Sequence, residues 1–309
     1  MSDTNKTIAV FGATGRQGGA VANELHRRGW SVRAITRNPD SVAAAGLNAR
    51  GINAVQGDLR NPASLEAALH GAVGVFGVTD YWEHGLKKEV ELGKGLINAA
   101  VASGVRHFVF SSVGGTDRTE GMGISHFDSK REIEAHLRSS GLPYTIFRPV
   151  TFYENFITPR FRRQICRAGV LRFCIHPNLP FQMVAMKDVG VFAAKAFAEP
   201  EDFIGQELEL ASDRFSMNDF ATGLGKHLGT PVRYEVIPEV AQWLVAGYVA
   251  ATRQSGHFKV GRSLINQFRW NNGSACGGWN ADLQALRRLH PDLVGLNDWI
   301  KSVNWTAGL

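Results

Sequence analysis

Short apolar runs alternate with amphipathic stretches along the first 150 residues. The run Ile8–Phe11 is followed by Ala20, Val21 and Leu25 at helical intervals, which predicts a buried strand and then a helix. Further strands are predicted at 31–36, 53–56, 72–78, 106–112 and 142–147. Because alternating strands and helices pair in parallel through right-handed crossovers, we predict an α/β fold with a doubly wound, Rossmann-type parallel sheet.

Three glycines, Gly12, Gly15 and Gly18, separate the first strand from the first helix. In a dinucleotide-binding turn the first glycine allows the sharp turn, the second lets the backbone approach a pyrophosphate, and the third lets the helix pack on the strand. The anion would lie on free amides at the helix start. The spacing GxxGxxG differs from GxGxxG, and a purely structural turn is the alternative.

The end of the second strand indicates which nucleotide is bound. A carboxylate about 20 positions after the glycines would bind the ribose 2′-hydroxyl of NAD, but the chain has Thr36-Arg37-Asn38 there. Arg37 could instead pair with a 2′-phosphate through a charge-assisted fork. A solvent-facing arginine is the alternative, and we favour NADP over NAD.

Other polar groups follow the remaining strands, where open parallel sheets bind ligands. Asp58 could accept a hydrogen bond from the adenine amine or serve only at a helix entry. Tyr81 and Trp82 could cover the nicotinamide or a substrate, or simply pack against the helix predicted from about 85 to 103. Ser111 and Ser112 end the fifth strand at the same edge.

Helix starts are predicted at Asn38-Pro39 and Asn61-Pro62, with asparagine as the cap and proline in the first turn. A later helix begins near His126 and runs to Gly141. His126 and Lys130 stand four residues apart, which places them on one helix face.

In the second half of the chain, the pattern of apolar residues predicts a strand near residue 183 and a helix capped near residue 188. Further elements are a strand at 207–210, a helix at 216–228, a strand at 232–237, a helix at 238–253, a loop at 271–278 and a closing helix. The segment 156–172 carries five arginines, which favours a basic helix facing solvent. An acidic partner surface is the alternative, and nucleic acid ranks third because no binding motif accompanies the charge.

Composition limits the class of protein. The 309 residues are 44% hydrophobic, enough for a sizeable core, and the formal net charge is +6. The first residues lack the apolar stretch of a signal peptide, and no apolar run has membrane-spanning length. The three cysteines have neither metal-binding nor redox spacing. We therefore expect a reduced, cytoplasmic protein with no metal, no membrane and no nucleic-acid partner.

Several motifs together carry a family resemblance: GATGRQGG, TRNP, QGD, VTDYWE, HFDSK and FRPVTFYENF. They resemble the NmrA-like branch of the atypical short-chain dehydrogenase/reductases, and the HSCARG-like redox-sensor proteins are the nearest group. The resemblance covers the first 160 residues closely and continues more loosely through MVAMKDVG and GQELELAS. It implies a Rossmann domain over 1–155 that binds NADP through the three glycines and Arg37. A smaller mixed domain over 156–309 would return some segments to the main sheet.

The resemblance also exposes a departure. Short-chain dehydrogenases usually have Tyr-x-x-x-Lys, whose tyrosine transfers the proton, whereas this chain has His126-Phe127-Asp128-Ser129-Lys130. Histidine could act as the acid/base group near neutral pH, or be only a helix-start residue. Lys130 is expected to bind the nicotinamide ribose and, less readily, to transfer a proton. The candidate catalytic residues are Lys130, His126 and Ser112.

The expected cofactor-binding set is larger than the glycine turn. It comprises Gly12, Thr14, Gly15, Arg16, Gln17, Gly18, Arg37, Asp58, Leu59, Thr79, Tyr81, Lys130, Pro149, Tyr153 and Asn155. Two functions remain open. The first is an NADP(H)-binding sensor of cofactor ratio with a degenerate active site, acting through a protein partner or a homodimer. The second is an NADPH-dependent reductase of a small carbonyl or aromatic natural product.

Overall fold

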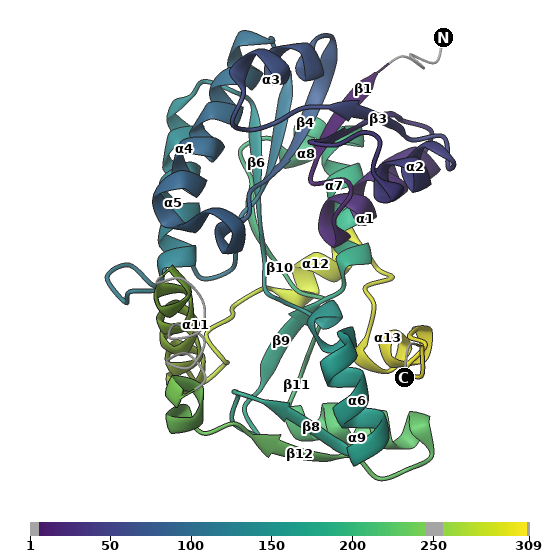
Figure 1. Cartoon of the computed structure of the whole chain (residues 1–309), viewed down its shortest axis with the longest axis vertical. Coiled ribbons are helices and arrows are strands. Elements are labelled where there is room, and N and C mark those ends of the chain that lie inside the picture. Colours follow the sequence, from purple (N-terminus) through teal and green to yellow (C-terminus); the bar gives the residue numbers. More distant parts are fainter. Residues whose placement is uncertain (1–5, 245–255, 308–309) are drawn as a thin grey trace. The chain divides into compact units, whose positions relative to one another are not determined.

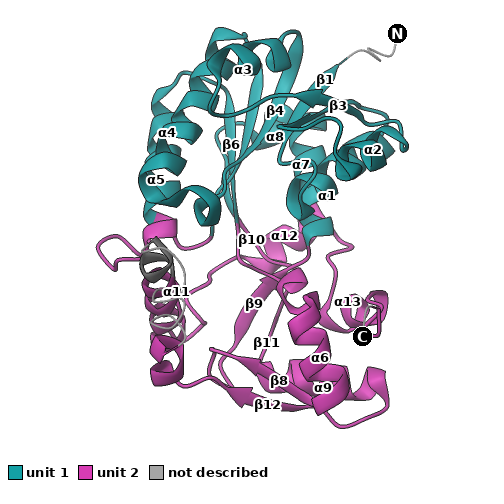
Figure 2. Ribbon diagram, in the orientation of Figure 1, with its two compact units in different colours: residues 1–113, 128–148, 186–208 teal, residues 114–127, 149–185, 209–309 magenta. Residues whose placement is uncertain are grey.

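The computed structural model describes residues 6–244 and 256–307 (Figure 1). Two compact units divide the chain (Figure 2). Unit 1 comprises Met1–Val113, Asp128–Arg148 and Met186–Leu208. Unit 2 comprises Gly114–Phe127, Pro149–Ala185 and Glu209–Leu309. Among the described residues, no helix combines the length and apolar character that crossing a membrane requires.

The main sheet has seven strands in the order β10-β6-β5-β4-β1-β2-β3. The strands are β1 (Thr7–Phe11), β2 (Ser31–Thr36), β3 (Asn53–Gln56), β4 (Ala72–Val78), β5 (His107–Ser111), β6 (Tyr144–Pro149) and β10 (Glu207–Leu210). The strands β1 to β6 pair in parallel, with β1 between β2 and β4. The predicted Rossmann-type α/β fold is confirmed.

Helices cover both faces of this sheet, which explains why its central strands β1 and β4 are mostly apolar. One face carries α3 (Pro62–Leu69), α4 (Tyr81–Ala102) and α5 (Ser125–Ser139) (Figure 1). The other face carries α1 (Arg16–Arg27), α2 (Val42–Asn48) and α7 (Met186–Ala198) (Figure 1). The short helix α8 (Pro200–Phe203) follows α7 in the chain. In β1, Ile8, Ala9 and Val10 are at most 1% exposed. The central strand is thus buried by helices on both sides.

Helix starts follow side-chain capping, and one prediction was wrong. Asn61 caps α3 by accepting from the Ser64 amide at 3.3 Å, as expected. Asn38 does not cap α2, because its side chain accepts from the Asp40 amide in a local turn. Ser41 caps α2 instead. Asparagine before proline serves both turns and helix starts, so the motif alone could not separate the two.

Helix α4 also starts earlier than predicted. Its first turn begins at Tyr81, after the cap Asp80, and Gly85 interrupts the helix with φ +69°. A left-handed residue inside a helix favours glycine because other side chains are strained there. The sequence pattern identified only the portion of α4 that follows this kink.

Unit 2 contains two small sheets. Their orders are β11-β9-β7 and β12-β8. The strands are β7 (Thr151–Phe152), β8 (Val170–Phe173), β9 (Phe181–Val184), β11 (Asp213–Phe215) and β12 (Arg233–Val236). The helices are η1 (Tyr153–Ile157), α6 (Pro159–Ala168), α9 (Met217–Leu228), α11 (Gly256–Gly273), α12 (Leu283–Leu289) and α13 (Leu296–Ser302).

Three expectations for unit 2 need correction or restriction. The basic helix is α6 alone, because Gly169 ends it with φ +60° and β8 follows. Helix α11 extends to Gly273, so the first part of the expected loop at 271–278 is helical. The expected helix at 238–253 is helical over 239–244, and the rest of it lies outside the described residues.

Helices α1 and α7 pack with almost no space between their backbones. A Cβ added to Gly190 of α7 would lie 2.8 Å from the carbonyl oxygen of Ala20 in α1. Real Cβ atoms do not approach a backbone oxygen so closely, so any side chain there would separate the two helices. This contact attaches the segment around α7 to the first strand–helix unit.

Replacing Gly190 by alanine is therefore expected to lower the free energy of unfolding by about 1–3 kcal/mol, the usual cost of overpacking. Gly95 of α4 provides the control, because a Cβ there would meet nothing within 4 Å. Gly95→Ala should stabilise by about 0.5–1 kcal/mol through helix propensity. Urea unfolding measures both variants, and a Gly190→Ala protein as stable as Gly95→Ala would contradict the close-packing argument.

Candidate functional site

The carboxyl ends of the parallel strands gather most of the predicted site residues at one edge of unit 1. Gly12 follows β1, Arg37 follows β2, Asp58 lies beyond β3, Thr79 follows β4 and Ser112 follows β5. They are 100 residues apart at most in the chain but share this edge because their strands are parallel. This edge is where open α/β sheets bind ligands.

The glycine turn has the geometry that its spacing predicted. Gly12 has φ +66°, and a Cβ on Gly18 would lie 2.3 Å from the Gly12 carbonyl oxygen. Gly15 is the residue before α1, and no side chain caps this helix. By contrast, Ser41, Asn61 and Asp80 cap the next three helices. The turn therefore leaves the first amides of α1 without a capping side chain, which suits an anionic group.

The residues beside this turn are mostly accessible. Thr14, Gly15 and Arg16 are exposed, and Gln17 donates its amide to the Ser111 hydroxyl. A cavity of about 640 Å³ borders the turn and is also lined by Arg50, which follows α2. The turn thus fits a dinucleotide phosphate sterically and electrostatically, because it lacks bulky side chains and two arginines line the adjoining cavity.

The ends of β2 and β3 carry two ion pairs. Arg37 donates to Glu83 in the first turn of α4. Arg60 donates to both carboxylate oxygens of Asp58, at 2.6–3.1 Å, and this hydrogen bonding lowers the pKa of Asp58 to about 2. Leu59 is half-buried and packs against the hydrophobic core. The expected adenine acceptor is therefore an ionised carboxylate that already has an arginine partner.

Lys130 is held by a buried group that the sequence analysis missed. Its Nζ donates to the Thr79 carbonyl at 2.8 Å and the Thr79 hydroxyl at 2.7 Å, and it pairs with Glu89 at 2.8 Å. The three ammonium protons are thus all used within unit 1. These contacts hold Lys130 at the end of β4, and a ribose hydroxyl would have to displace one of them.

Glu89 lies in the middle of α4 and is fully buried. It also accepts hydrogen bonds from the hydroxyls of Thr79, at 2.8 Å, and Ser129. Burial raises the pKa of Glu89, but attraction to Lys130 and these hydrogen bonds outweigh burial, so its pKa lies below the usual value. The sequence contained one sign of this role: Glu89 is a carboxylate three residues after Leu86, on the apolar stripe of the helix.

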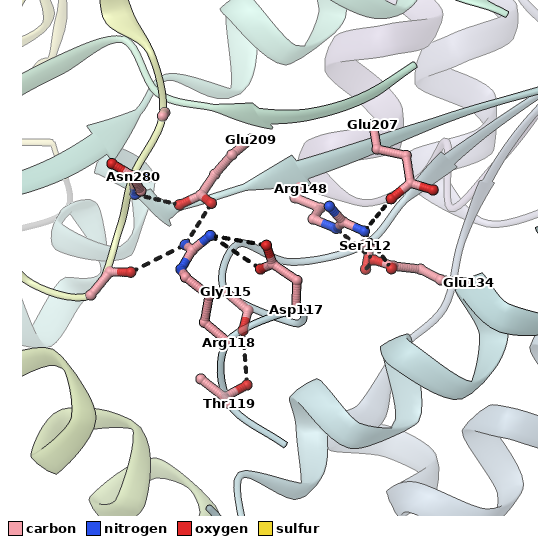
Figure 3. A network of polar contacts seen from close by, with 12 residues as sticks. Ser112, Gly115, Asp117, Arg118, Thr119, Glu134, Arg148, Glu207, Glu209 and Asn280 are labelled. Carbon is pink, nitrogen blue, oxygen red and sulfur yellow. Dashed lines mark hydrogen bonds and ion pairs between the residues drawn. The ribbon is translucent and has the colours of Figure 1, made fainter. Parts of the chain in front are cut away.

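Ser112 belongs to a charge network rather than standing free. Its hydroxyl donates to Glu134 at 2.5 Å, and Glu134 also accepts two hydrogen bonds from Arg148. Arg148 pairs in turn with Glu207 at 2.5 Å (Figure 3). Arg138 joins the carboxylates of Glu134 and Glu207. Hydrogen bonding from Arg138 and attraction to both arginines lower the pKa of Glu207. This network connects β5, β6, β10 and α5.

His126 belongs to unit 2 and is 8% exposed. Its Nε2 lies 3.0 Å from the Gln267 side-chain oxygen, and its Nδ1 lies 2.6 Å from the Ser263 hydroxyl. Since the Gln267 oxygen only accepts, Nε2 carries a proton. Both ring nitrogens have partners on α11, which attaches the start of α5 to that helix.

The last predicted cofactor residues also lie in unit 2. Pro149 ends β6, and its carbonyl accepts from the Gly114 amide at 2.9 Å. Tyr153 is fully buried between Phe215 and Trp299, with ring centroids 5.9 and 4.9 Å away. Asn155 is exposed on η1. A packing role accounts for Tyr153 within this unit.

The two aromatic residues after β4 differ. Tyr81 is 4% exposed, whereas Trp82 is 52% exposed, and their rings meet edge to face at 5.3 Å. Only Trp82 presents most of its ring to solvent. Of the two roles considered for this pair, packing therefore suits Tyr81, whereas Trp82 is accessible to a ligand.

A glycine turn between β1 and α1, at the edge where the strand order reverses, defines a Rossmann-like protein with a dinucleotide-type site. Within this class, the chain belongs to the NmrA-like family, whose sequence profile matches residues 4–273.

Known relatives agree with this assignment. The NmrA-like family domain-containing oxidoreductase ptmS of Penicillium ochrochloron is 29% identical over 266 residues, which are 79% of this chain and 78% of the relative. The Escherichia coli NADPH-dependent quinone oxidoreductase QOR2, solved with NADPH, has a TM-score of 0.77 and 24% identity over 95% of this chain and 98% of that chain. NmrA, a negative transcriptional regulator solved with NADP, has a TM-score of 0.78 and 20% identity over 97% and 96%. Both solved structures share the fold.

The Glu89–Lys130 pair gives a testable prediction about stability. Glu89→Gln leaves the Lys130 ammonium buried without its counter-charge, so the free energy of unfolding should fall by about 3–5 kcal/mol. Chemical unfolding at neutral pH measures this change.

The matched control removes both charges. Glu89→Gln combined with Lys130→Met should recover most of the lost stability, because no uncompensated charge remains buried. A single variant as stable as the wild type would show that the pair does not carry this energetic role.

Proposed function

We propose that this protein binds NADP(H) at the carboxyl edge of the unit 1 sheet and acts as a sensor of cofactor state. The glycine turn would hold the pyrophosphate on the first amides of α1, and Arg37 would pair with the 2′-phosphate. Lys130 would contact the nicotinamide ribose by exchanging one of its present partners. The HSCARG-like resemblance and the solved relatives that contain NADP(H) support this proposal.

One observation favours the sensor function over catalysis: all three candidate catalytic side chains form hydrogen bonds or ion pairs with other residues of the protein. Ser112 donates to Glu134, and the ammonium of Lys130 donates to Thr79 and pairs with Glu89. His126 uses both ring nitrogens on α11. A general acid needs an accessible proton in reach of its substrate. Binding that changes a partner or the oligomeric state needs none.

A reductase is the second candidate, and the names of relatives favour it. Curated relatives such as ptmS are named oxidoreductases, and QOR2 is named an NADPH-dependent quinone oxidoreductase. NADPH, when bound, supplies a hydride. Water could then protonate an acceptor whose reduced form is a stable anion, so that the protein would need only to orient the substrate. The substrate class would be a small carbonyl or aromatic compound.

The choice of nucleotide is tested through Arg37. NADPH should bind more tightly than NADH by about 1.5–3 kcal/mol, because a charge-assisted pair forms only with the 2′-phosphate. This difference corresponds to about one to two decades in Kd. Arg37→Ala should bring the two Kd values together, as measured by titration calorimetry. Equal Kd values for the wild type would contradict the NADP assignment.

Sensor and reductase are separated by a panel of carbonyl and quinone substrates with NADPH. Lys130→Met combined with Glu89→Gln, and His126→Gln, are the variants to use. Removing the Lys130 ammonium alone would leave Glu89 buried without its counter-charge, and alanine at 126 would leave Ser263 and Gln267 unpaired. As a sensor, the wild type should show negligible turnover. As a reductase with His126 as general acid, turnover should fall by about 10²–10⁴ in His126→Gln.

The same samples are measured by light scattering without nucleotide, with NADPH and with NADP⁺. The sensor function requires a difference in mass or shape between these states, or a partner whose binding changes between them. Robust wild-type turnover together with identical scattering in all three states would favour the reductase.

A further inference from the structure

Arg37, the proposed partner of the 2′-phosphate, already has an anionic neighbour. Its Nη1 donates to a carboxylate oxygen of Glu83. The two side chains are 54% and 42% exposed, so solvent and a ligand can reach both groups. The adjacent pair of Asp58 and Arg60 is also held together by side-chain hydrogen bonds. Each of these two arginines at the ribose end of the site therefore has a carboxylate of its own.

The position of Glu83 follows from the first turn of α4. Asp80 accepts hydrogen bonds from the amides of Trp82 and Glu83, at 2.8 and 3.3 Å, and so starts this turn directly after β4. Gly85, with φ +69° and ψ 173°, ends it before the main part of the helix begins. Since β1 separates β4 from β2 in the sheet, the side chain of Glu83 extends from β4 toward the end of β2 to meet Arg37.

We infer that Glu83 is a specificity-determining residue of the nucleotide site, because its carboxylate competes with the 2′-phosphate for Arg37. This inference rests on the proposed binding of NADP(H). A phosphate that approaches Arg37 meets the negative charge of Glu83, so the ion pair must loosen or the two anions repel each other. NADH lacks the 2′-phosphate and leaves the pair undisturbed. Glu83 therefore weakens NADPH selectively and sets the preference between the two nucleotides.

The test removes the charge of Glu83 while keeping its shape. Glu83→Gln should lower the Kd of NADPH by about two- to fivefold, the range expected for an exposed ion pair, and change the Kd of NADH much less. The gain should shrink as salt rises, because salt screens exposed charges. Titration calorimetry with both nucleotides at low and high salt provides these values.

Glu91→Gln is the matched control. Glu91 also lies on α4 and is exposed, but it pairs with Lys88 at 2.6 Å. The substitution changes the net charge of the protein by the same amount, so it reports any general effect of charge on NADPH. A Glu83→Gln protein that binds NADPH no better than Glu91→Gln would overturn the inference.

The second arm repeats Glu83→Gln in the Arg37→Ala background. There the gain in NADPH affinity should be smaller, because only direct repulsion between the phosphate and the carboxylate remains once they no longer share a guanidinium. A gain of the same size without Arg37 would overturn the competition. The proposed function fails separately: it is overturned when the wild type binds neither nucleotide, whereas normal, Arg37-dependent NADPH binding with no effect of Glu83→Gln overturns only the role of Glu83.

Discussion

The candidate site of unit 1 depends on the ion pair and hydrogen bonds of one buried carboxylate, that of Glu89. It joins the end of β4 through Thr79 to α5 through Ser129 and Lys130. A buried lysine without a counter-charge would be costly, so Lys130 can lie at this edge of the sheet only because α4 supplies an anion. The same pairing limits the chemistry of Lys130, because an ammonium with three partners is a poor proton donor to a fourth.

Charge pairing recurs at the other polar positions of this edge. Arg37 has Glu83, Asp58 has Arg60, and Ser112 donates to Glu134. Such pairs satisfy these polar groups within the protein. On the proposed function, nucleotide binding would therefore exchange partners rather than fill unsatisfied positions, and its free energy would be the difference between two sets of contacts.

Membership of the NmrA-like family does not choose between regulation and reduction. The family includes proteins named oxidoreductases, and the shared fold is found both in a transcriptional regulator and in a quinone oxidoreductase. A Rossmann sheet presents the cofactor edge in either case, so the fold carries no information about turnover. The distinction depends on whether the protein turns over a substrate, with the proton supplied either by a side chain near the edge or by water.

The sequence by itself determined the parallel sheet, the glycine turn, the place of Arg37 after the second strand and the helix that carries Lys130. These features depend on local periodicity and on short spacings such as that between Gly12 and Gly18, which a linear pattern contains. Only the tertiary structure decided that Glu83 meets Arg37 and that Glu89 meets Lys130. Each of these pairs joins residues more than 40 positions apart. They form because the parallel strands end at one edge, where the first turn of α4 meets the end of β2 and the main part of α4 meets α5.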